Sequence, residues 1–239
     1  MSTNKNIAVI GANGFVGTEI CSLLNESPNH TLSKVVRGDN AEEKIKNSSA
    51  VIYCANSSGR YFANNNPQED YKDTVEKLAA IYSLLGDKKM ILVSTISARV
   101  QLHTPYGRNR RTCELLMNEK KDLVIRLGPM YAHNNLKGAL FDIILNKKVY
   151  VNESTEYSYT NVRYNARKIL ESMGQTGLVE IGANNAIQLG YLRKVLDSSS
   201  RFEGEDDTQI IKSNAPDSPD AYDVIDFARN VKCHGLWEK

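Results

Sequence analysis

The stretch Ile7-Ala-Val-Ile-Gly-Ala-Asn-Gly-Phe-Val-Gly17 reads as a short apolar strand, a glycine turn and the beginning of a helix. Its glycines are spaced GxxGxxG. Gly11 allows a sharp turn after the strand, Gly14 lets backbone N–H groups approach a ligand, and Gly17 lets the helix pack closely on the sheet. The N-terminus of that helix has a partial positive charge, which favours a bound pyrophosphate. The pattern is typical of a dinucleotide-binding turn.

The segments that follow predict a parallel sheet, because strands and helices alternate along the first half of the chain. We expect strands at 6–10, 32–36, 50–54, 90–93 and 123–126, helices at 15–24, 70–85 and 106–118, and a short polar helix or turn at 39–46. The predicted fold is α/β, a Rossmann-type doubly wound parallel sheet with a small C-terminal substrate lobe. The predicted domains are a dinucleotide-binding domain over residues 1–130 and a substrate-binding lobe over 131–239, interleaved with the first.

The pattern is looser after residue 130. We expect helices at 140–145, 166–173 and 189–196, short strands at 149–151, 178–181 and 208–212, and a polar loop-rich stretch over 198–220. The run Tyr157-Ser-Tyr-Thr-Asn-Val-Arg163 alternates polar and aromatic side chains. Such a run is typical either of a segment that lines a cleft or of an exposed edge strand.

Charge and composition exclude several classes of protein. A formal net charge of +2 without a basic cluster argues against nucleic acid as a partner. No apolar run approaches the ~20 residues that span a bilayer, and the N-terminus lacks the apolar region of a signal peptide, so we expect a cytoplasmic protein without a membrane partner. The cysteines are widely spaced and form no CxxC pair, which predicts free thiols and no metal site. They are Cys21, Cys54, Cys113 and Cys233.

The glycine turn also predicts which residues contact the cofactor. In the turn these are Gly11, Asn13, Gly14, Phe15, Val16 and Gly17. The position that reads the adenine ribose lies about 20 residues further along, at the end of the second strand. Arg37 lies there and could pair with the 2′-phosphate of NADP, whereas Asp39 could hold a ribose hydroxyl. We therefore predict NADP, with NAD as the alternative.

Five further stretches follow in order: Val51-Ile-Tyr-Cys-Ala-Asn56, Ile91-Leu-Val-Ser-Thr95, Tyr106-Gly-Arg-Asn-Arg110, Arg126-Leu-Gly-Pro-Met-Tyr131, and Gly177-Leu-Val-Glu-Ile-Gly-Ala183 with the helical pattern after it. Together with the glycine turn they resemble the extended short-chain dehydrogenases/reductases, the NAD-dependent epimerase/dehydratase group. The resemblance extends to about Leu196 and suggests a short, divergent member. It departs from the family at Arg110, where the family has lysine.

The resemblance implies hydride transfer beside a tyrosine whose hydroxyl gives or takes a proton. The matching catalytic positions are Thr95, Tyr106 and Arg110, with Ser94 and Ser97 as alternates for the hydroxyl. Cys54 and Ala55 match small residues beside the cofactor, which Tyr106 and Arg110 are also expected to contact. A cation near the tyrosine would lower the tyrosine pKa, and Arg110 would also reach the cofactor ribose. Independently of the family, Tyr106 and Arg110 are four residues apart on a predicted helix and so share a face. Alternatively, Tyr106 is only a turn residue and Arg110 a surface charge.

The same resemblance implies a nucleotide-linked sugar as substrate, bound near Ser97, Tyr131, His133 and Asn134. We expect an NAD(P)-dependent oxidoreductase or epimerase acting on a nucleotide-activated sugar or a similar carbonyl or alcohol. A reductase is favoured because no carboxylate follows Thr95. The alternative is a catalytically inactive NAD(P)-binding sensor or scaffold, which Arg110 in place of lysine supports. Family members often form homodimers through helices that correspond to 70–85 and 106–118.

Overall fold

The computed structural model describes residues 5–133, 137–211 and 215–234, which form two compact units. The first unit contains the chain up to Arg126 and the segment Arg163–Val179. The second contains Leu127–Val162 and the chain from Glu180 onward. The chain therefore leaves the first unit, returns to it once and then completes the second.

The first unit is built on a six-stranded parallel sheet, in the order β2-β1-β3-β4-β5-β9. The strands are β1 Lys5–Ile10, β2 His30–Val35, β3 Ala50–Tyr53, β4 Lys89–Thr95, β5 Leu123–Leu127 and β9 Gly177–Ile181. The central strands are apolar on both faces, and Val51, Ile52 and Tyr53 are all fully buried. Such continuous apolar strands are expected where helices cover both faces of a parallel sheet. The α/β Rossmann-type prediction is confirmed.

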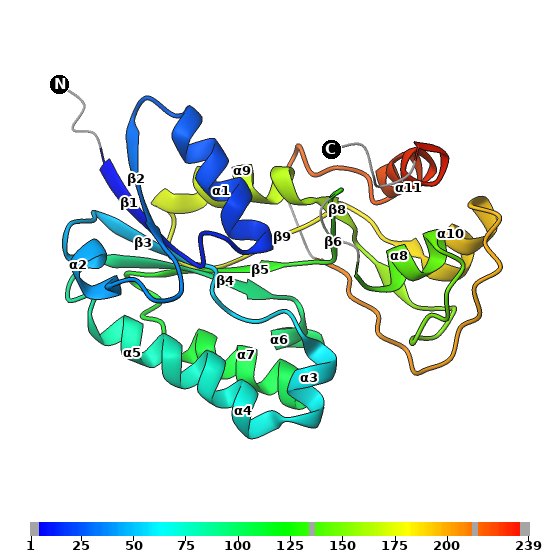
Figure 1. Cartoon of the computed structure of the whole chain (residues 1–239), viewed down its shortest axis with the longest axis horizontal. Helices are drawn as coiled ribbons and strands as arrows, with labels where there is room; N and C mark the ends of the chain where they lie inside the picture. Colours follow the sequence, from blue (N-terminus) through cyan, green and yellow to red (C-terminus); the bar gives the residue numbers. More distant parts are fainter. Residues whose placement is uncertain (1–4, 134–136, 212–214, 235–239) are drawn as a thin grey trace. The chain divides into compact units, whose positions relative to one another are not determined.

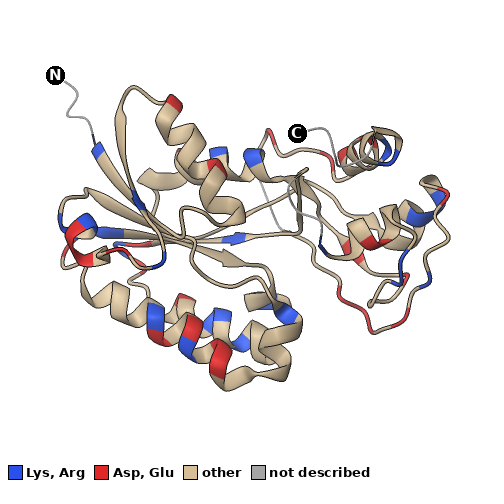
Figure 2. Cartoon of the chain, in the orientation of Figure 1, with Lys and Arg blue, Asp and Glu red and all other residues tan. Residues whose placement is uncertain are grey.

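Helices cover both faces of this sheet, with α1 and α9 on one face and α4, α5 and α7 on the other (Figure 1). The helices of the first unit are α1 Phe15–Glu26, α2 Ala41–Lys46, α3 Arg60–Asn65, α4 Pro67–Tyr71, α5 Lys77–Ser83, α6 Ser97–Val100, α7 Pro105–Leu115 and α9 Val162–Glu171. A π-helical turn, η1 Lys72–Glu76, joins α4 to α5, so the helix expected at 70–85 is interrupted. Figure 2 shows Lys and Arg interspersed with Asp and Glu along these solvent-facing helices.

The strand order places a topological switch point between β1 and β3. The chain passes from β1 to β2 on one side and then returns across β1 to form β3 on the other. The ends of the two strands are level, because Ile10 pairs with Tyr53. In open α/β sheets, ligands bind outside the carboxyl ends of the strands at such a point. The glycine turn directly follows β1 and so lies at this place.

Two glycines in the turn are required by close backbone contacts. Gly11 has φ +83°, and a Cβ there would lie 2.9 Å from the backbone of Ala55. A Cβ on Gly17 would lie 2.2 Å from the carbonyl oxygen of Gly11. No side chain fits at either position, so α1 can begin beside the ends of β1 and β3 only because both residues are glycine.

The second unit contains its own hydrophobic core. Its elements are β6 Met130–Tyr131, α8 Ala139–Ile144, β7 Glu156–Tyr157, β8 Thr160–Asn161, β10 Ile187–Gln188, α10 Leu189–Val195 and α11 Asp223–His234. The core packs α8, α10 and α11 together through residues such as Phe141, Leu192 and Val224. Among the described residues, none of the helices combines the length and apolarity needed to cross a membrane.

The second unit departs from the sequence prediction in several places. In the described part of the strands expected at 149–151 and 208–212 there are only isolated bridges, at Val149 and Gln209, and Lys212 lies outside the described residues. Helix α11 was not predicted, although Val224, Ile225, Ala228 and Val231 are buried at helical spacing. The many aspartates before and within α11 hide that apolar stripe.

The close contact at Gly17 predicts a stability effect. The substitution Gly17→Ala should lower the free energy of unfolding by about 2–3 kcal/mol. The free-energy cost of packing a methyl group against the backbone exceeds the gain from the higher helix propensity of alanine. Urea unfolding followed by circular dichroism measures this. The control is Gly174→Ala, where a Cβ meets nothing within 4 Å and the expected change is within about 0.5 kcal/mol. A Gly17→Ala protein as stable as wild type would contradict the described packing.

Candidate active site

The carboxyl end of β4 presents two predicted hydroxyl groups side by side. Thr95 is the last residue of the strand, and its Oγ1 accepts a hydrogen bond from the Ser97 N–H at 3.3 Å. The Thr95 hydroxyl also donates to the Ser97 hydroxyl at 3.4 Å. Ser97 is buried, whereas Thr95 is only partly covered. Of the two, Thr95 is the better placed to meet a substrate.

Ser94, the other candidate hydroxyl, is used inside the protein. It donates to Glu114 Oε1 on α7 at 2.7 Å. Arg126 donates to both carboxylate oxygens of Glu114, at 2.9 and 2.6 Å, and Arg111 pairs with Oε2. This buried network ties α7 to the ends of β4 and β5, and its role is to fix the helix that contains Tyr106.

Contacts at the start of α7 fix the position of Tyr106. Thr104 caps the helix by accepting the Gly107 N–H at 3.0 Å, and Pro105 occupies the first turn, where its missing N–H costs nothing. Asn64 of α3 accepts the Tyr106 N–H at 3.1 Å. A Cβ on Gly107 would lie 2.1 Å from the Gln101 carbonyl oxygen, so glycine lets α7 pack against the end of α6.

The structure brings Tyr106 and Arg110 together, as their spacing predicts. The guanidinium Cζ lies 4.4 Å from the centroid of the Tyr106 ring. Arg110 is not a surface charge, because it is 1% exposed. Its terminal nitrogens donate to the carboxylate of Asp70 at 3.2 and 3.1 Å and to the Ser57 carbonyl at 2.5 Å. Contact between Arg110 and a cofactor ribose stays a prediction.

Sequence reasoning missed Asp70. The residue is the first of the helix expected at 70–85, and aspartate is rarely buried without a partner. One signal was present, since Asp70, Thr74 and Leu78 follow each other at intervals of four and all three are buried on one helix face. Nothing in the sequence pairs that face with Arg110, which lies on a different helix.

The turn after β1 fits a diphosphate. Gly14 is the N-cap of α1, with φ −76° and ψ 169°, and no side chain caps this helix. Its first-turn N–H groups, on Phe15 and Val16, therefore point to a position where an anion is favoured. A Cβ on Gly14 would meet the Gly11 oxygen at 3.1 Å. Unlike Gly11, Gly14 has a backbone conformation open to any residue, and unlike at Gly17 a Cβ there would not overlap the backbone. Ligand approach therefore accounts better for glycine here.

Two residues with different roles lie where the sequence predicts contact with the adenine ribose. Arg37 lies just after β2 and is exposed. Asp39 instead stabilises its own turn, because its Oδ2 accepts the Val36 N–H at 2.8 Å and Lys44 Nζ at 2.7 Å. The Lys44 hydrogen bond, together with that from Val36, lowers the Asp39 pKa. Of the pair, Arg37 is the one whose charge remains available to a ligand.

The predicted substrate residues on the second unit gather around α11. The Tyr131 ring lies 4.7 Å from Phe227, and the exposed His133 ring lies 4.9 Å from it. Burial raises the pKa of Tyr131 to about 12, with the Asp223 carboxylate adding to the shift, so its hydroxyl stays neutral. Asn134 lies outside the described residues. Of the two alternatives for 157–163, the exposed edge strand is wrong, since Tyr157, Ser158, Tyr159 and Thr160 are buried.

All four cysteines are free thiols. Cys21 and Cys113 are buried, and burial raises the pKa of Cys113 to about 12, which leaves it unreactive at neutral pH. Cys54 follows β3 beside Gly11, where its backbone helps form the wall of the turn. Among the described residues, no three His, Cys, Asp or Glu side chains are grouped to hold a metal ion.

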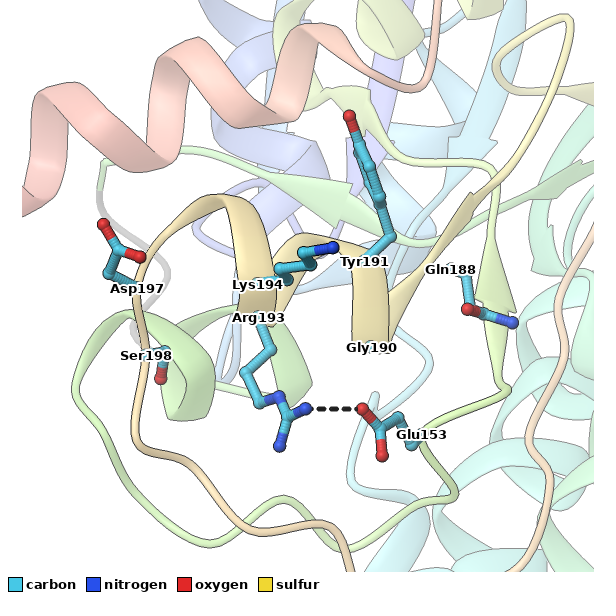
Figure 3. A pocket seen from close by; sticks show the side chains of 8 residues that line it. All are labelled: Glu153, Gln188, Gly190, Tyr191, Arg193, Lys194, Asp197 and Ser198. Atoms are coloured by element: carbon cyan, nitrogen blue, oxygen red, sulfur yellow. Dashed lines mark hydrogen bonds and ion pairs between the residues drawn. The ribbon is translucent and has the colours of Figure 1, made fainter.

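Two open hollows lie away from these residues. One, of about 500 Å³, lies in the second unit, and Figure 3 shows Arg193 and Glu153 pointing toward each other across it. Their ion pair, at 2.7 Å, accounts for both charges. The other, of about 350 Å³, is lined by residues of α4, η1 and α7, including Tyr71 and Asn109. Neither includes a predicted site residue, and the strand topology favours the glycine turn as the ligand site.

A scan against models of protein families found no match, and neither did a search of curated protein sequences. Solved structures do match. A UDP-N-acetylglucosamine 4-epimerase from Methanobrevibacter ruminantium M1, in complex with UDP-N-acetylmuramic acid, is 14% identical with a TM-score of 0.76, over 96% of this chain and 97% of that one. A dTDP-4-dehydrorhamnose reductase from Clostridium acetobutylicum is 14% identical with a TM-score of 0.74, over 95% and 99%.

A third match is a UDP-glucose 4-epimerase with UDP-glucose from Thermotoga maritima, 16% identical with a TM-score of 0.73, over 87% of this chain and 90% of that one. At such low identities these matches show the fold. The chain has the fold of extended short-chain dehydrogenases/reductases, as its motifs predict.

Proposed function

We propose that this protein is an NAD(P)-dependent oxidoreductase of the short-chain dehydrogenase/reductase type. The observation that supports it most directly is the Gly11–Gly17 turn, which places an uncapped helix N-terminus at the β1/β3 switch point. The backbone of Cys54 and Ala55 closes the other side of that turn. Proteins of the same fold include the epimerases and the reductase named above. NADP is the proposed cofactor, because Arg37 offers an exposed cation beyond β2.

Each catalytic residue has a distinct proposed task. The bound nicotinamide, when reduced, supplies a hydride. Thr95 orients the substrate oxygen with its hydroxyl, and Tyr106 donates the proton that this oxygen takes up. Arg110 acts through the Tyr106 ring that it covers, because its terminal nitrogens already bind Asp70 and Ser57. A phenol that donates a proton suits reduction of a carbonyl, so we favour a reductase over an epimerase or dehydratase.

The proposed substrate is a nucleotide-linked sugar or a similar carbonyl compound. The aromatic group formed by Tyr131, His133 and Phe227 offers flat surfaces and a neutral hydroxyl, which suit a base or a sugar ring. A homodimer is also part of the proposal. Leu84, after α5, and Leu115, at the end of α7, are 40% and 67% exposed, and a partner chain would cover them.

One observation favours a second function, an NAD(P)-binding sensor without turnover. Short-chain reductases that this chain resembles use lysine beside the tyrosine. Here the corresponding Arg110 is buried and held by Asp70. A cation fixed in this way does not move with the reaction, which favours a protein without turnover. Cofactor binding at the glycine turn does not depend on Arg110.

The first prediction concerns turnover. Tyr106→Phe should lower the rate of NADPH oxidation with 4-keto nucleotide sugars by about 100- to 10,000-fold, because the proton donor is lost, while NADPH affinity stays unchanged. Absorbance of reduced nicotinamide measures the rate. Tyr61→Phe is the matched control, since Tyr61 is 84% exposed on α3 and should behave as wild type. Cofactor binding without turnover on a broad panel, in wild type and variant alike, would favour the sensor.

The second prediction concerns the cofactor. Gly14→Asp should reduce NADPH affinity at least about tenfold more than Gly14→Asn does, because its carboxylate repels the diphosphate and competes for the helix N-terminus. Both residues are good N-caps, so both variants should fold as stably as wild type. Calorimetric titration with NADPH measures the affinities. Equal affinities in the two variants would show that no anion is bound at this turn.

A further inference from the structure

Arg110 is held by a residue 40 positions earlier in the chain, on a different helix. Its Nη1 and Nη2 donate to the two oxygens of Asp70 at 3.2 and 3.1 Å, which makes the pair bidentate. The two side chains are only 2% and 1% exposed. Nη2 also donates to the Ser57 carbonyl at 2.5 Å. A planar guanidinium bound at both terminal nitrogens has a fixed orientation.

Asp70 is itself fixed from two directions. Asn109 Nδ2 on α7 donates to Asp70 Oδ2 at 2.8 Å. The Thr74 hydroxyl, one helical turn further along, donates to the Asp70 carbonyl oxygen at 2.5 Å. Asn109 therefore holds the carboxylate of Asp70 beneath α7, and Thr74 holds its backbone.

We propose that Asp70 is the positioning residue of the Tyr106 site: it holds the Arg110 guanidinium over the tyrosine ring and offsets its charge. This inference rests on the proposed function, in which Tyr106 donates a proton. An uncompensated guanidinium 4.4 Å from the ring centroid would stabilise the phenolate and lower the Tyr106 pKa. The Asp70–Arg110 pair has no net charge, so the Asp70 carboxylate offsets the attraction of the guanidinium for negative charge on the Tyr106 oxygen.

Other charges on the elements packed against α7 are more exposed to solvent than this pair. They are Arg60 on α3, Glu69 on α4, Lys72, Asp73 and Glu76 on η1, Lys89 on β4, and Arg99 on α6, none of which is buried. On α7 itself, Arg108 binds backbone carbonyls, and the buried Glu114 is neutralised by Arg126 and Arg111. Solvent screens exposed charges strongly, so Asp70 and Arg110 dominate the electrostatics at Tyr106.

Titration of Tyr106 tests the inference without requiring activity. The full chain is labelled with 13Cζ-tyrosine, and Tyr106→Phe identifies the resonance. Asp70→Asn should lower the Tyr106 pKa by about one to two pH units, and Arg110→Met should raise it by a similar amount, because each removes one charge of the pair. The Asp70→Asn/Arg110→Met double variant should return close to the wild-type value.

A purely structural Asp70 predicts a different outcome, namely a folded Asp70→Asn protein whose Tyr106 pKa stays within a few tenths of wild type. That result would overturn the inference. If the variants do not fold, 15N spectra of the arginine side chains of the wild-type protein test whether the Arg110 guanidinium is held in place. The Arg110→Lys variant then assigns the Arg110 resonances. Separate, slowly exchanging Nη resonances are expected for a bound guanidinium, and a single averaged resonance would contradict the inference. Failure to bind NADPH would count against the proposed function alone.

Discussion

The close approach of the first turn to the end of β3 is the constraint on which the rest of the site depends. Gly11 touches the backbone of Ala55, and Gly17 touches Gly11, so strand, turn and helix meet with no side chain between them. This contact aims the N-terminus of α1 at the switch point between β1 and β3. Any larger residue at Gly11 or Gly17 would move the helix and the donors at its first turn.

The second constraint is electrostatic, and it lies on the other face of the sheet. The Asp70–Arg110 pair joins α4 to α7 in an environment almost without solvent. Burying both charges costs free energy that their attraction only partly returns, so a pair of this kind is better explained by specificity than by stability. Its contact with the Tyr106 ring is the basis of the positioning role that we propose for Asp70. The family that the motifs resemble has lysine at this position, whereas Arg110 is a cation with a fixed partner.

Most strands and helices of the first unit could be predicted from the sequence, because its strands are apolar on both faces and its turn needs glycine. It placed Tyr106 and Arg110 on one helix face, which the structure confirms. It did not find Asp70, since pairing between two helices leaves no trace in local spacing. It also missed α3, whose Asn64 binds the Tyr106 N–H, and α11, whose apolar stripe stands among aspartates. Tertiary contacts, rather than local pattern, decide these features.

The central claim is that the turn after β1 binds the diphosphate of a nicotinamide dinucleotide. A crystal structure of the full chain with NADP tests it most directly. The account predicts the diphosphate at the backbone N–H groups of Phe15 and Val16, with the 2′-phosphate within hydrogen-bond distance of Arg37 and the nicotinamide toward Tyr106. Clear density for the dinucleotide at another place, or an empty turn in crystals saturated with NADP and with NAD, would contradict it.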